Sequence, residues 1–319
     1  MTFRWSWVVF IILGVMLAAV WQEQGPTGSH QQEAKLFPEL ASHLGDLSSI
    51  EVLSQTGKVS LVRGKNGWVV VERDHYQADF SKINALVEAL VKAKLVERKT
   101  AKPGNHSVLG LAGLASQGSQ ARRVSGISGD YNFSVLVGNQ SDLREASFVR
   151  RESEDQVWLT DVILNPAREV QSWLDSVIID VDASEILSAE FFNDQGVRTL
   201  RAVQGEGDEN WQLAGGYEGR PLKYSTIVNS IGRALTNLRL VDVALHDPDR
   251  WQESHSVKFE LKEERMVTIL VADLQEQTWL RVEDKAGLPD EAKWDYKVES
   301  TRYDEFVKTA EDFLQKQDE

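Results

Sequence analysis

The sequence predicts an α+β protein in which an N-terminal transmembrane helix precedes two tandem repeated α+β lobes with mainly antiparallel sheets. Three observations carry this prediction: an uncharged run near the N-terminus, two stretches that read alike, and strand patterns that outnumber helical ones. The expected divisions are a stub and transmembrane helix at 1–21, a tether with a short amphipathic segment at 22–48, and repeats at 49–176 and 177–319.

Composition restricts the classes of function. The 319 residues fit two domains of ordinary size, and 42% hydrophobic residues can build a sizeable core. The formal net charge of −14 disfavours nucleic-acid binding, which needs clustered Lys and Arg. The chain has no cysteine, which excludes disulfides, thiolate nucleophiles and Cys-ligated zinc or iron–sulfur clusters.

The run from Trp5 to Trp21 has the features of a membrane-spanning helix. Its 17 residues contain no charge, and at a helical rise of about 1.5 Å each they span roughly 25 Å. Trp5, Trp7 and Trp21 lie at its two ends, where indole rings favour the membrane interface. We therefore expect membrane lipid to be a partner of this segment.

The flanking charges predict the orientation of that helix. Arg4 precedes the run and Glu23 follows it, which favours a cytoplasmic N-terminus. The expected location is the bacterial inner membrane, crossed once, with the body in the periplasm or outside the cell. A cleaved signal peptide and a buried core helix are the alternatives, and a mature N-terminus beginning after Ala19 would refute the anchor.

Two stretches of the body share a helical pattern that follows paired strand patterns. The first predicted helix has Asp79 as its N-cap, and the second has Pro221 in its first turn. Apolar residues recur in both at helical spacing. Trp68 matches Trp211, and Leu90, Leu95 and Pro103 match Leu235, Leu240 and Pro248 at a constant offset of 145.

Later segments extend the similarity between the halves. The run 133–138 resembles 267–272, the run 147–150 resembles 278–281, and 157–159 matches 294–296 less closely. Each half then ends in a short helical pattern. Between the first helix and these strands, the Gly-rich stretch 104–130 predicts a flexible loop without the spacings that bind phosphate.

The ordered set of these segments resembles the bacterial domain-of-unknown-function 4340 family. The similarity rests on LFPEL at 36–40, the Gly67-Trp68 pair, LVERKT at 95–100, the strand at 148–151 and Trp173-Leu174-Asp175. It covers roughly residues 36–182 well, and it covers the second half more loosely, through the repeat. Members of this family are envelope proteins often encoded beside an ABC transporter of the gliding-motility type. The resemblance implies an accessory extracytoplasmic subunit with ABC transporter membrane subunits as partners, and it supplies no catalytic residues.

The sequence contains no motif that indicates catalytic, cofactor-binding or metal-binding residues. The six histidines lack ligand spacing, and Asp180, Asp182 and Glu185 fail the EF-hand pattern because positions 6 and 12 are wrong. No GxSxG nucleophile motif occurs. Trp251, beside Pro248, is the best candidate for an exposed contact residue.

These observations favour a non-catalytic, membrane-anchored binding or assembly module of an ABC transporter system, without a cofactor and without nucleic acid as a partner. The alternative is an envelope hydrolase with carboxylates in the cleft between the two lobes. That alternative predicts convergent acids with perturbed pKa values between the lobes.

Overall fold

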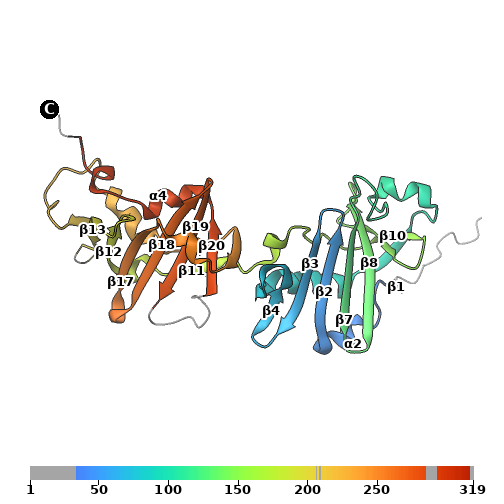
Figure 1. Cartoon of the computed structure of the whole chain (residues 1–319). Helices are drawn as coiled ribbons and strands as arrows, with labels where there is room; N and C mark the ends of the chain where they lie inside the picture. Colours follow the sequence, from blue (N-terminus) through green and yellow to red (C-terminus); the bar gives the residue numbers. More distant parts are fainter. Residues whose placement is uncertain (1–33, 206, 208–209, 285–292, 317–319) are drawn as a thin grey trace, which may run out of the picture.

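Antiparallel strands dominate the structure, and they form two large sheets that lie end to end in an elongated molecule (Figure 1). The computed structural model describes residues 34–205, 207, 210–284 and 293–316. We call the ten-stranded sheet and the segments packed on it the first lobe, and the eight-stranded sheet and its segments the second lobe.

The first sheet has the strand order β1-β6-β10-β9-β8-β7-β2-β3-β4-β5, and every neighbouring pair is antiparallel. Its strands are β1 (Ala34–Lys35), β2 (Leu47–Ser54), β3 (Lys58–Gly64), β4 (Gly67–Val70), β5 (Tyr76–Gln77), β6 (Lys94–Arg98), β7 (Arg122–Ser128), β8 (Tyr131–Gln140), β9 (Ser147–Arg151) and β10 (Val157–Thr160).

The second sheet has the order β14-β13-β12-β17-β18-β19-β20-β16, and β11 with β15 forms a separate two-stranded sheet. The strands are β11 (Val177–Ile179), β12 (Ile186–Phe192), β13 (Arg198–Val203), β14 (Gln212–Ala214), β15 (Leu238–Arg239), β16 (Asp242–Leu245), β17 (His255–Leu261), β18 (Met266–Leu274), β19 (Gln277–Asp284) and β20 (Trp294–Val298).

The two sheets share one topology. Read from the other end, the second sheet runs β16-β20-β19-β18-β17-β12-β13-β14, which is the order of β6-β10-β9-β8-β7-β2-β3-β4 in the first. Even a register irregularity recurs, because the pairing shifts between Leu47 and Ser49 in β2 and between Ile186 and Ser188 in β12. Each lobe is closed by one isolated bridge, Ala78 with Leu174 and Leu222 with Leu314.

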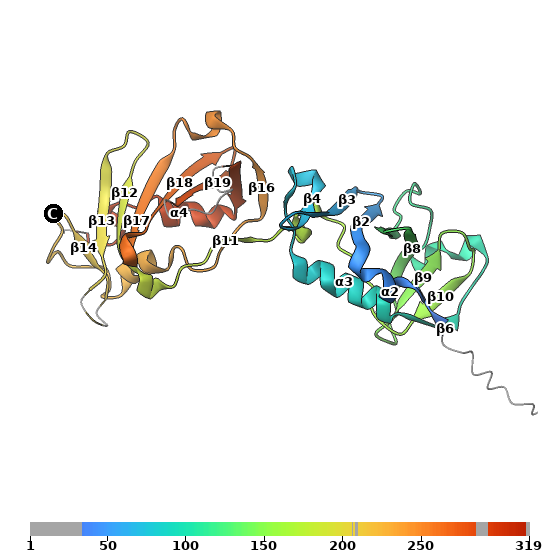
Figure 2. The ribbon, with the colours of Figure 1, turned by 90° about the horizontal axis from the view of Figure 1, so that it is seen from below.

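Helix α3 (Phe80–Lys92) lies along one face of the first sheet (Figure 2). The side chain of Asp79 caps its N-terminus by accepting the backbone N–H groups of Ser81 and Lys82. Ile83, Leu86 and Leu90 form its buried stripe and join the main core. The buried residues of both lobes belong to one connected apolar cluster, which is continuous across the junction through contacts such as that of Tyr76 with Trp294.

The predicted α+β class is wrong, because the described residues form a mainly β protein. Apart from α3, the α-helices in this part of the chain are α2 (Leu40–His43) and α4 (Tyr303–Phe306), one turn each. The helix predicted after Pro221 is instead the 3₁₀ segment η7 (Ile227–Arg233). A Cβ on Gly232 would lie 2.5 Å from Nε1 of Trp211, so this segment packs closely against that ring and only glycine fits there.

The closing helical patterns and the Gly-rich loop also differ from expectation. The first pattern is the 3₁₀ turn η5 (Val170–Trp173), and the second is split between α4 and η12 (Ala310–Asp312). Part of the predicted loop is strand β7. Its Gly126 lies under the ring of Phe133, where a Cβ would come within 2.4 Å, so this glycine marks close packing rather than a loop.

The predicted transmembrane run 5–21 lies outside the described residues, and so do Trp5, Trp7 and Trp21. Among the helices of the described part, none has the length and apolar character needed to cross a bilayer. The anchor therefore gains no support from the structure.

Candidate functional site

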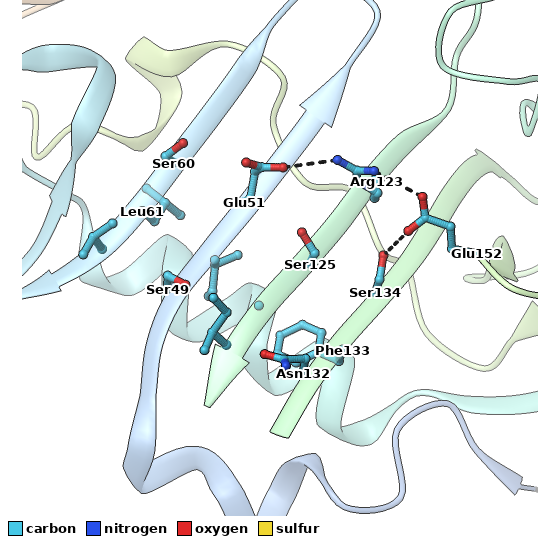
Figure 3. Close-up of a pocket in the computed structure, with 14 residues that line it drawn as sticks. Ser49, Glu51, Ser60, Leu61, Arg123, Ser125, Asn132, Phe133, Ser134 and Glu152 are labelled. Carbon is cyan, nitrogen blue, oxygen red and sulfur yellow. Dashed lines mark hydrogen bonds and ion pairs between the residues drawn. The ribbon is translucent and has the colours of Figure 1, made fainter. Parts of the chain in front are cut away.

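An open groove of about 700 Å³ lies on the outer face of the first sheet (Figure 3). Ile50 and Val52 of β2 point into the core, so Ser49 and Glu51 between and beside them point outward. Strands β3, β7 and β8 alternate in the same way. They add hydroxyl side chains to the groove, which are those of Ser60, Ser125 and Ser134.

Arg123 organises the charged end of the groove. Its Nη2 lies 3.4 Å from Oε1 of Glu51, and its Nη1 lies 3.1 Å from Oε1 of Glu152. The hydroxyl of Ser134 donates to the other carboxylate oxygen of Glu152 at 2.9 Å. The guanidinium is therefore held between two carboxylates, and the rest of the groove presents neutral hydroxyls.

The protonation of Glu152 follows from these contacts. The hydrogen bond from Ser134 is the main cause that lowers the pKa of Glu152, and the hydrogen bond and charge of Arg123 add to it against partial burial. A carboxyl with a lowered pKa stays ionised at neutral pH. It can hold a donor in place, but it is a poor general acid.

The segment from 101 to 121 covers the neighbouring part of the same face. Leu111 from this segment packs with Leu136 of β8 and Val157 of β10 in a small apolar cluster separate from the main core. The groove is the part of the face that this cover leaves open. Ile127, which is 50% exposed, is its one strongly exposed apolar side chain.

The corresponding face of the second lobe has different chemistry. Strand pairing places Glu51 opposite Ser60 and Ser125, and it places Glu190 opposite Arg201 and Lys258. Two serines of the first lobe thus correspond to two long cations in the second. Glu190 also accepts a hydrogen bond from Arg198 at 3.0 Å. This face therefore carries an acidic side chain surrounded by basic side chains of the neighbouring strands.

The junction of the lobes is held by a forked ion pair. Nε and Nη2 of Arg73 donate to the two oxygens of Asp242 at 2.6 and 2.9 Å, and Gln171 donates to the same carboxylate at 3.0 Å. Tyr76 packs edge-on against Trp294 with ring centroids 5.1 Å apart. An ion pair, a hydrogen bond and an aromatic contact therefore hold the two lobes together at the junction.

The pKa of Asp242 reflects that contact. Burial acts to raise the pKa, but the hydrogen bonds from Arg73, Gln171 and the backbone of Val243 outweigh it and leave the pKa below its usual value. The hydrolase alternative needs an acid with a raised pKa at the junction, and Asp242 has the opposite shift. The junction therefore does not favour that alternative.

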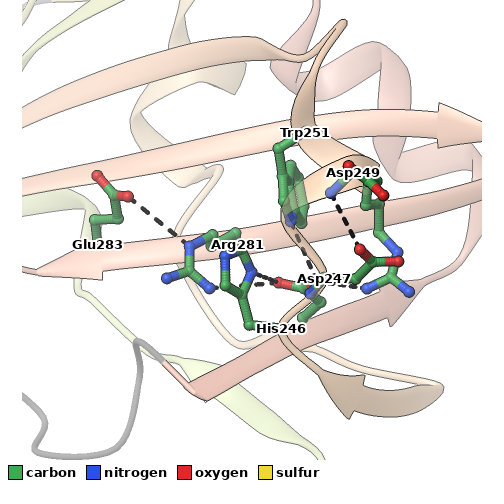
Figure 4. Close-up of polar contacts among 8 residues, drawn as sticks. His246, Asp247, Asp249, Trp251, Arg281 and Glu283 are labelled. Atoms are coloured by element: carbon green, nitrogen blue, oxygen red, sulfur yellow. Dashed lines mark hydrogen bonds and ion pairs between the residues drawn. The ribbon is translucent and has the colours of Figure 1, made fainter.

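Trp251 belongs to a polar cluster in the second lobe (Figure 4). The fully buried carboxylate of Asp295 accepts from the indole N–H of Trp251 at 3.1 Å, and it pairs with His246 at 3.1 Å and with Arg250. Arg281 lies 3.4 Å away. Trp251 is half-buried in 3₁₀ turn η8 (Pro248–Trp251), and its predicted role as a contact residue stays a prediction.

The acidic residues near the lobe boundary form hydrogen bonds or ion pairs within the chain. Asp180 accepts the backbone N–H of Asn237, Asp182 accepts that of Ser184, and Glu185 pairs with Lys262 at 3.6 Å. In the described part of the chain, no three His, Asp or Glu side chains are grouped so that they could hold a metal ion.

Sequence reasoning missed the groove. Its residues form no contiguous motif, because they come from strands far apart in the sequence. The available signal was alternation: Ser49 with Glu51, and Arg123 with Ser125, are polar residues two apart that flank the apolar Ile50 and Val124. Only the pairing of β2 with β7 brings these two pairs to one face.

The fold and the groove define a class: a duplicated antiparallel β-sheet protein with an open polar groove on one of its two sheets. The sequence matches the family described as "Domain of unknown function (DUF4340)" over residues 68–264, and the chain belongs to this family. The matched range begins in β4 and ends between β17 and β18, so it includes parts of both lobes. Comparisons with curated proteins and with solved structures find no significant match.

Proposed function

We propose that this protein is a non-catalytic binding and assembly module whose first lobe holds a partner protein in the outer-face groove. The observation that carries the proposal is the groove itself, an open hollow of about 700 Å³ with hydroxyls, one exposed apolar side chain and internally paired charges. Such a surface suits a protein segment with hydrogen-bonding groups and small apolar groups.

The pairing of the groove charges supports binding over catalysis. Glu51 and Glu152 both contact Arg123, and the lowered pKa of Glu152 keeps it ionised. Paired charges of this kind fix the orientation of a ligand more than they transfer protons. The bonded junction supports a scaffold role, because it ties the second lobe to the groove-bearing lobe.

The partner that we propose is a membrane subunit of an ABC transporter, with this protein as an accessory subunit outside the cytoplasm at the bacterial inner membrane. Family resemblance and the sequence pattern of residues 5–21 support this location. A reporter enzyme that works only in the cytosol, fused after Glu319, tests the topology: activity of that fusion would refute it.

The binding test compares equivalent positions in the two lobes. Ser125→Lys introduces into the groove the residue that the second lobe has at the corresponding place, Lys258, so the sheet is expected to tolerate it. Affinity purification from solubilised membranes should recover a transporter membrane subunit with the wild type. We expect at least about a tenfold loss with Ser125→Lys, because the long side chain fills the groove and adds a charge beside Glu51, which is opposite position 125.

Lys258→Ser is the matched control and should bind as well as the wild type. If no transporter subunit copurifies with the wild type above background, the proposed partner is wrong. If Ser125→Lys retains full binding while its thermal unfolding is unchanged, the groove is not the docking site.

A further inference from the structure

An apolar hollow of about 310 Å³ lies beside helix α3, on the face of the first sheet that this helix covers (Figure 2). Ala85 and Ala89, one helical turn apart, line it, and so does the segment 163–167. The short alanine side chains leave room between the helix and this segment, in which Ile163 is 41% exposed. We call this space the α3 hollow. Its volume suits a small apolar group rather than a large ligand.

Arg122 lies against the wall of the α3 hollow. Its Nη1 donates to Oδ1 of Asn165 and, at 3.4 Å, to the carbonyl oxygen of Pro166. Both of these residues line the hollow. Its Nη2 donates to the carbonyl oxygen of Gly138 at 3.1 Å. Every acceptor of this guanidinium is therefore neutral.

A second arginine, Arg168, lies close to the first. It follows Ala167 of the hollow, and its Nη2 donates to the carbonyl oxygen and to the side-chain Oε1 of Gln120 at 2.7 and 3.0 Å. Gln120 is two positions before Arg122 in the chain. Within the described part of the chain, neither arginine forms an ion pair, and Nη1 of Arg168 donates no hydrogen bond.

This pair of arginines lacks negative charge. Burial is the main cause that lowers the pKa of Arg122, the like charge of Arg168 lowers it further, and Glu169 opposes them with the smallest effect. The Nε groups of both arginines are covered and have no acceptor. Composition does not force this arrangement, because the chain has 49 acidic side chains for 35 basic ones. A bound anion would offset the repulsion between the two guanidinium groups.

We propose that this site binds a phosphate monoester, with the phosphate group against Arg122 and Arg168 and the apolar group of the ester in the α3 hollow. Guanidinium groups match phosphate oxygens with pairs of N–H donors. A phosphate monoester carries a charge of about −1.5 to −2 at neutral pH, which balances two arginines better than one carboxylate does. The site and the groove lie on opposite faces of the first sheet, so the inference is independent of the proposed function.

The test is isothermal titration calorimetry of the full-length chain in neutral detergent, with hexyl phosphate and inorganic phosphate as probes. We expect hexyl phosphate to bind at least about tenfold more tightly, because burial of its chain in the hollow adds to the contact of the phosphate. Added salt should weaken the binding of both probes. Heptanoate, which has a chain of the same length but a single charge, should bind at least about tenfold more weakly than hexyl phosphate.

Two variants separate the two parts of the site. Arg168→Gln should weaken the binding of both phosphate probes at least about tenfold. Ala85→Leu fills the hollow from an exposed helix position, so it should remove the advantage of hexyl phosphate and leave the binding of inorganic phosphate unchanged. Arg233→Gln removes an exposed arginine of the second lobe and is the matched control, which should bind like the wild type.

Soluble esters and membrane lipids both supply a phosphate monoester with an apolar group. Phosphatidic acid added to the same micelles distinguishes them. Displacement of bound hexyl phosphate would assign a lipid as the source, and retention of hexyl phosphate would assign a soluble ester.

Absence of hexyl phosphate binding at millimolar concentration would overturn the proposal. An Arg168→Gln variant with unchanged thermal unfolding and unchanged affinity would do the same, because it would place the phosphate elsewhere. Equal affinity for heptanoate would refute the phosphate, and an advantage of hexyl phosphate that survives Ala85→Leu would refute the role of the hollow.

Discussion

The two lobes have side chains of opposite polarity at one equivalent position on the outer faces of their sheets. Trp158 pairs with Val149 in the first lobe as Tyr296 pairs with Leu280 in the second, so the residues before them, Val157 and Asp295, correspond. Val157 lies in an apolar cluster under the segment 101–121, whereas Asp295 gathers polar donors from 246–251. The comparison teaches that this fold constrains the inner face of each sheet and leaves the outer face free to acquire different roles.

The inner faces show that constraint directly. Side chains between sheet and cover must fill space at high density, so both lobes keep a continuous buried core. The outer faces are covered only in part, so much of each faces water and can vary more in its side chains. In the first lobe the result is a groove, and in the second it is a ladder of ion pairs. The predictions below test the differences between the lobes, from the largest expected effect to the smallest.

Replacing Asp295 by the residue of the first lobe should produce the largest effect. Asp295→Val leaves Arg250 and Arg281 without their buried carboxylate, and we expect a loss of about 3–5 kcal/mol in the free energy of unfolding. Chemical denaturation followed by tryptophan fluorescence measures it. Glu283→Ala removes an exposed partner 3.8 Å from Arg281 and should change stability by less than about 0.5 kcal/mol. Equal effects of the two variants would contradict the assignment.

The segment 101–121, which covers part of the first sheet, comes close to the backbone of Asn139 at Gly110. The φ of Gly110 is +72°, and a Cβ there would lie 2.7 Å from the backbone nitrogen of Asn139. Gly110→Ala should therefore cost about 2–3 kcal/mol. Gly118 has the same φ and open space around it, so Gly118→Ala should cost only about 1 kcal/mol. Differential scanning calorimetry of both variants separates steric conflict from backbone strain, and identical losses would refute the close approach.

The junction should weaken in acid. The pKa of Asp242 is lower in the folded protein than in the unfolded chain, so its contribution is present above the unfolded pKa and is lost as pH falls through the folded pKa. We expect about 1 kcal/mol of stability to disappear below roughly pH 4. Unfolding of wild type and Asp242→Asn across pH 2–7 measures it. The variant should lack this part of the pH dependence, and parallel curves would contradict the role of the ion pair.

A hairpin of the second lobe should gain stability from a glycine. Glu263 and Glu264 adopt φ values of 57° and 59° between β17 and β18, whereas the hairpin between β7 and β8 has Gly129 at 59°. Glu264→Gly should therefore raise the free energy of unfolding by about 0.5–1 kcal/mol. Glu264→Ala keeps a Cβ in the left-handed region and should give no such gain. A stabilised Ala variant would show that charge rather than backbone conformation is responsible.

The sequence predicts strands and repeat matches well where the pattern is local. The runs 133–138 and 267–272 correspond to β8 and β18, and Asp79 caps α3 as expected. The weaker match of 157–159 with 294–296 is displaced by one residue, because strand pairing aligns Trp158 with Tyr296. Hydrophobic spacing around Val228 and Ile231 correctly indicates burial, but the segment is a 3₁₀ turn whose Gly232 lies directly against the ring of Trp211.

The site was harder to predict for a physical reason. Glu51, Arg123 and Glu152 are brought together by the pairing of strands that are distant in sequence, and no spacing rule encodes that distance. The same is true of the junction, where Arg73 and Asp242 are 169 positions apart. Residues that act together across a sheet become visible only when the strand order is known.

The most direct test of the central claim is photo-crosslinking in membranes with one reactive amino acid at either of two equivalent positions, Ser125 or Lys258. The account predicts a crosslink from position 125 to a transporter membrane subunit and none to that subunit from position 258. A crosslink from position 258 alone, or from neither position in a folded and expressed protein, would contradict the claim that the first lobe's groove holds the partner.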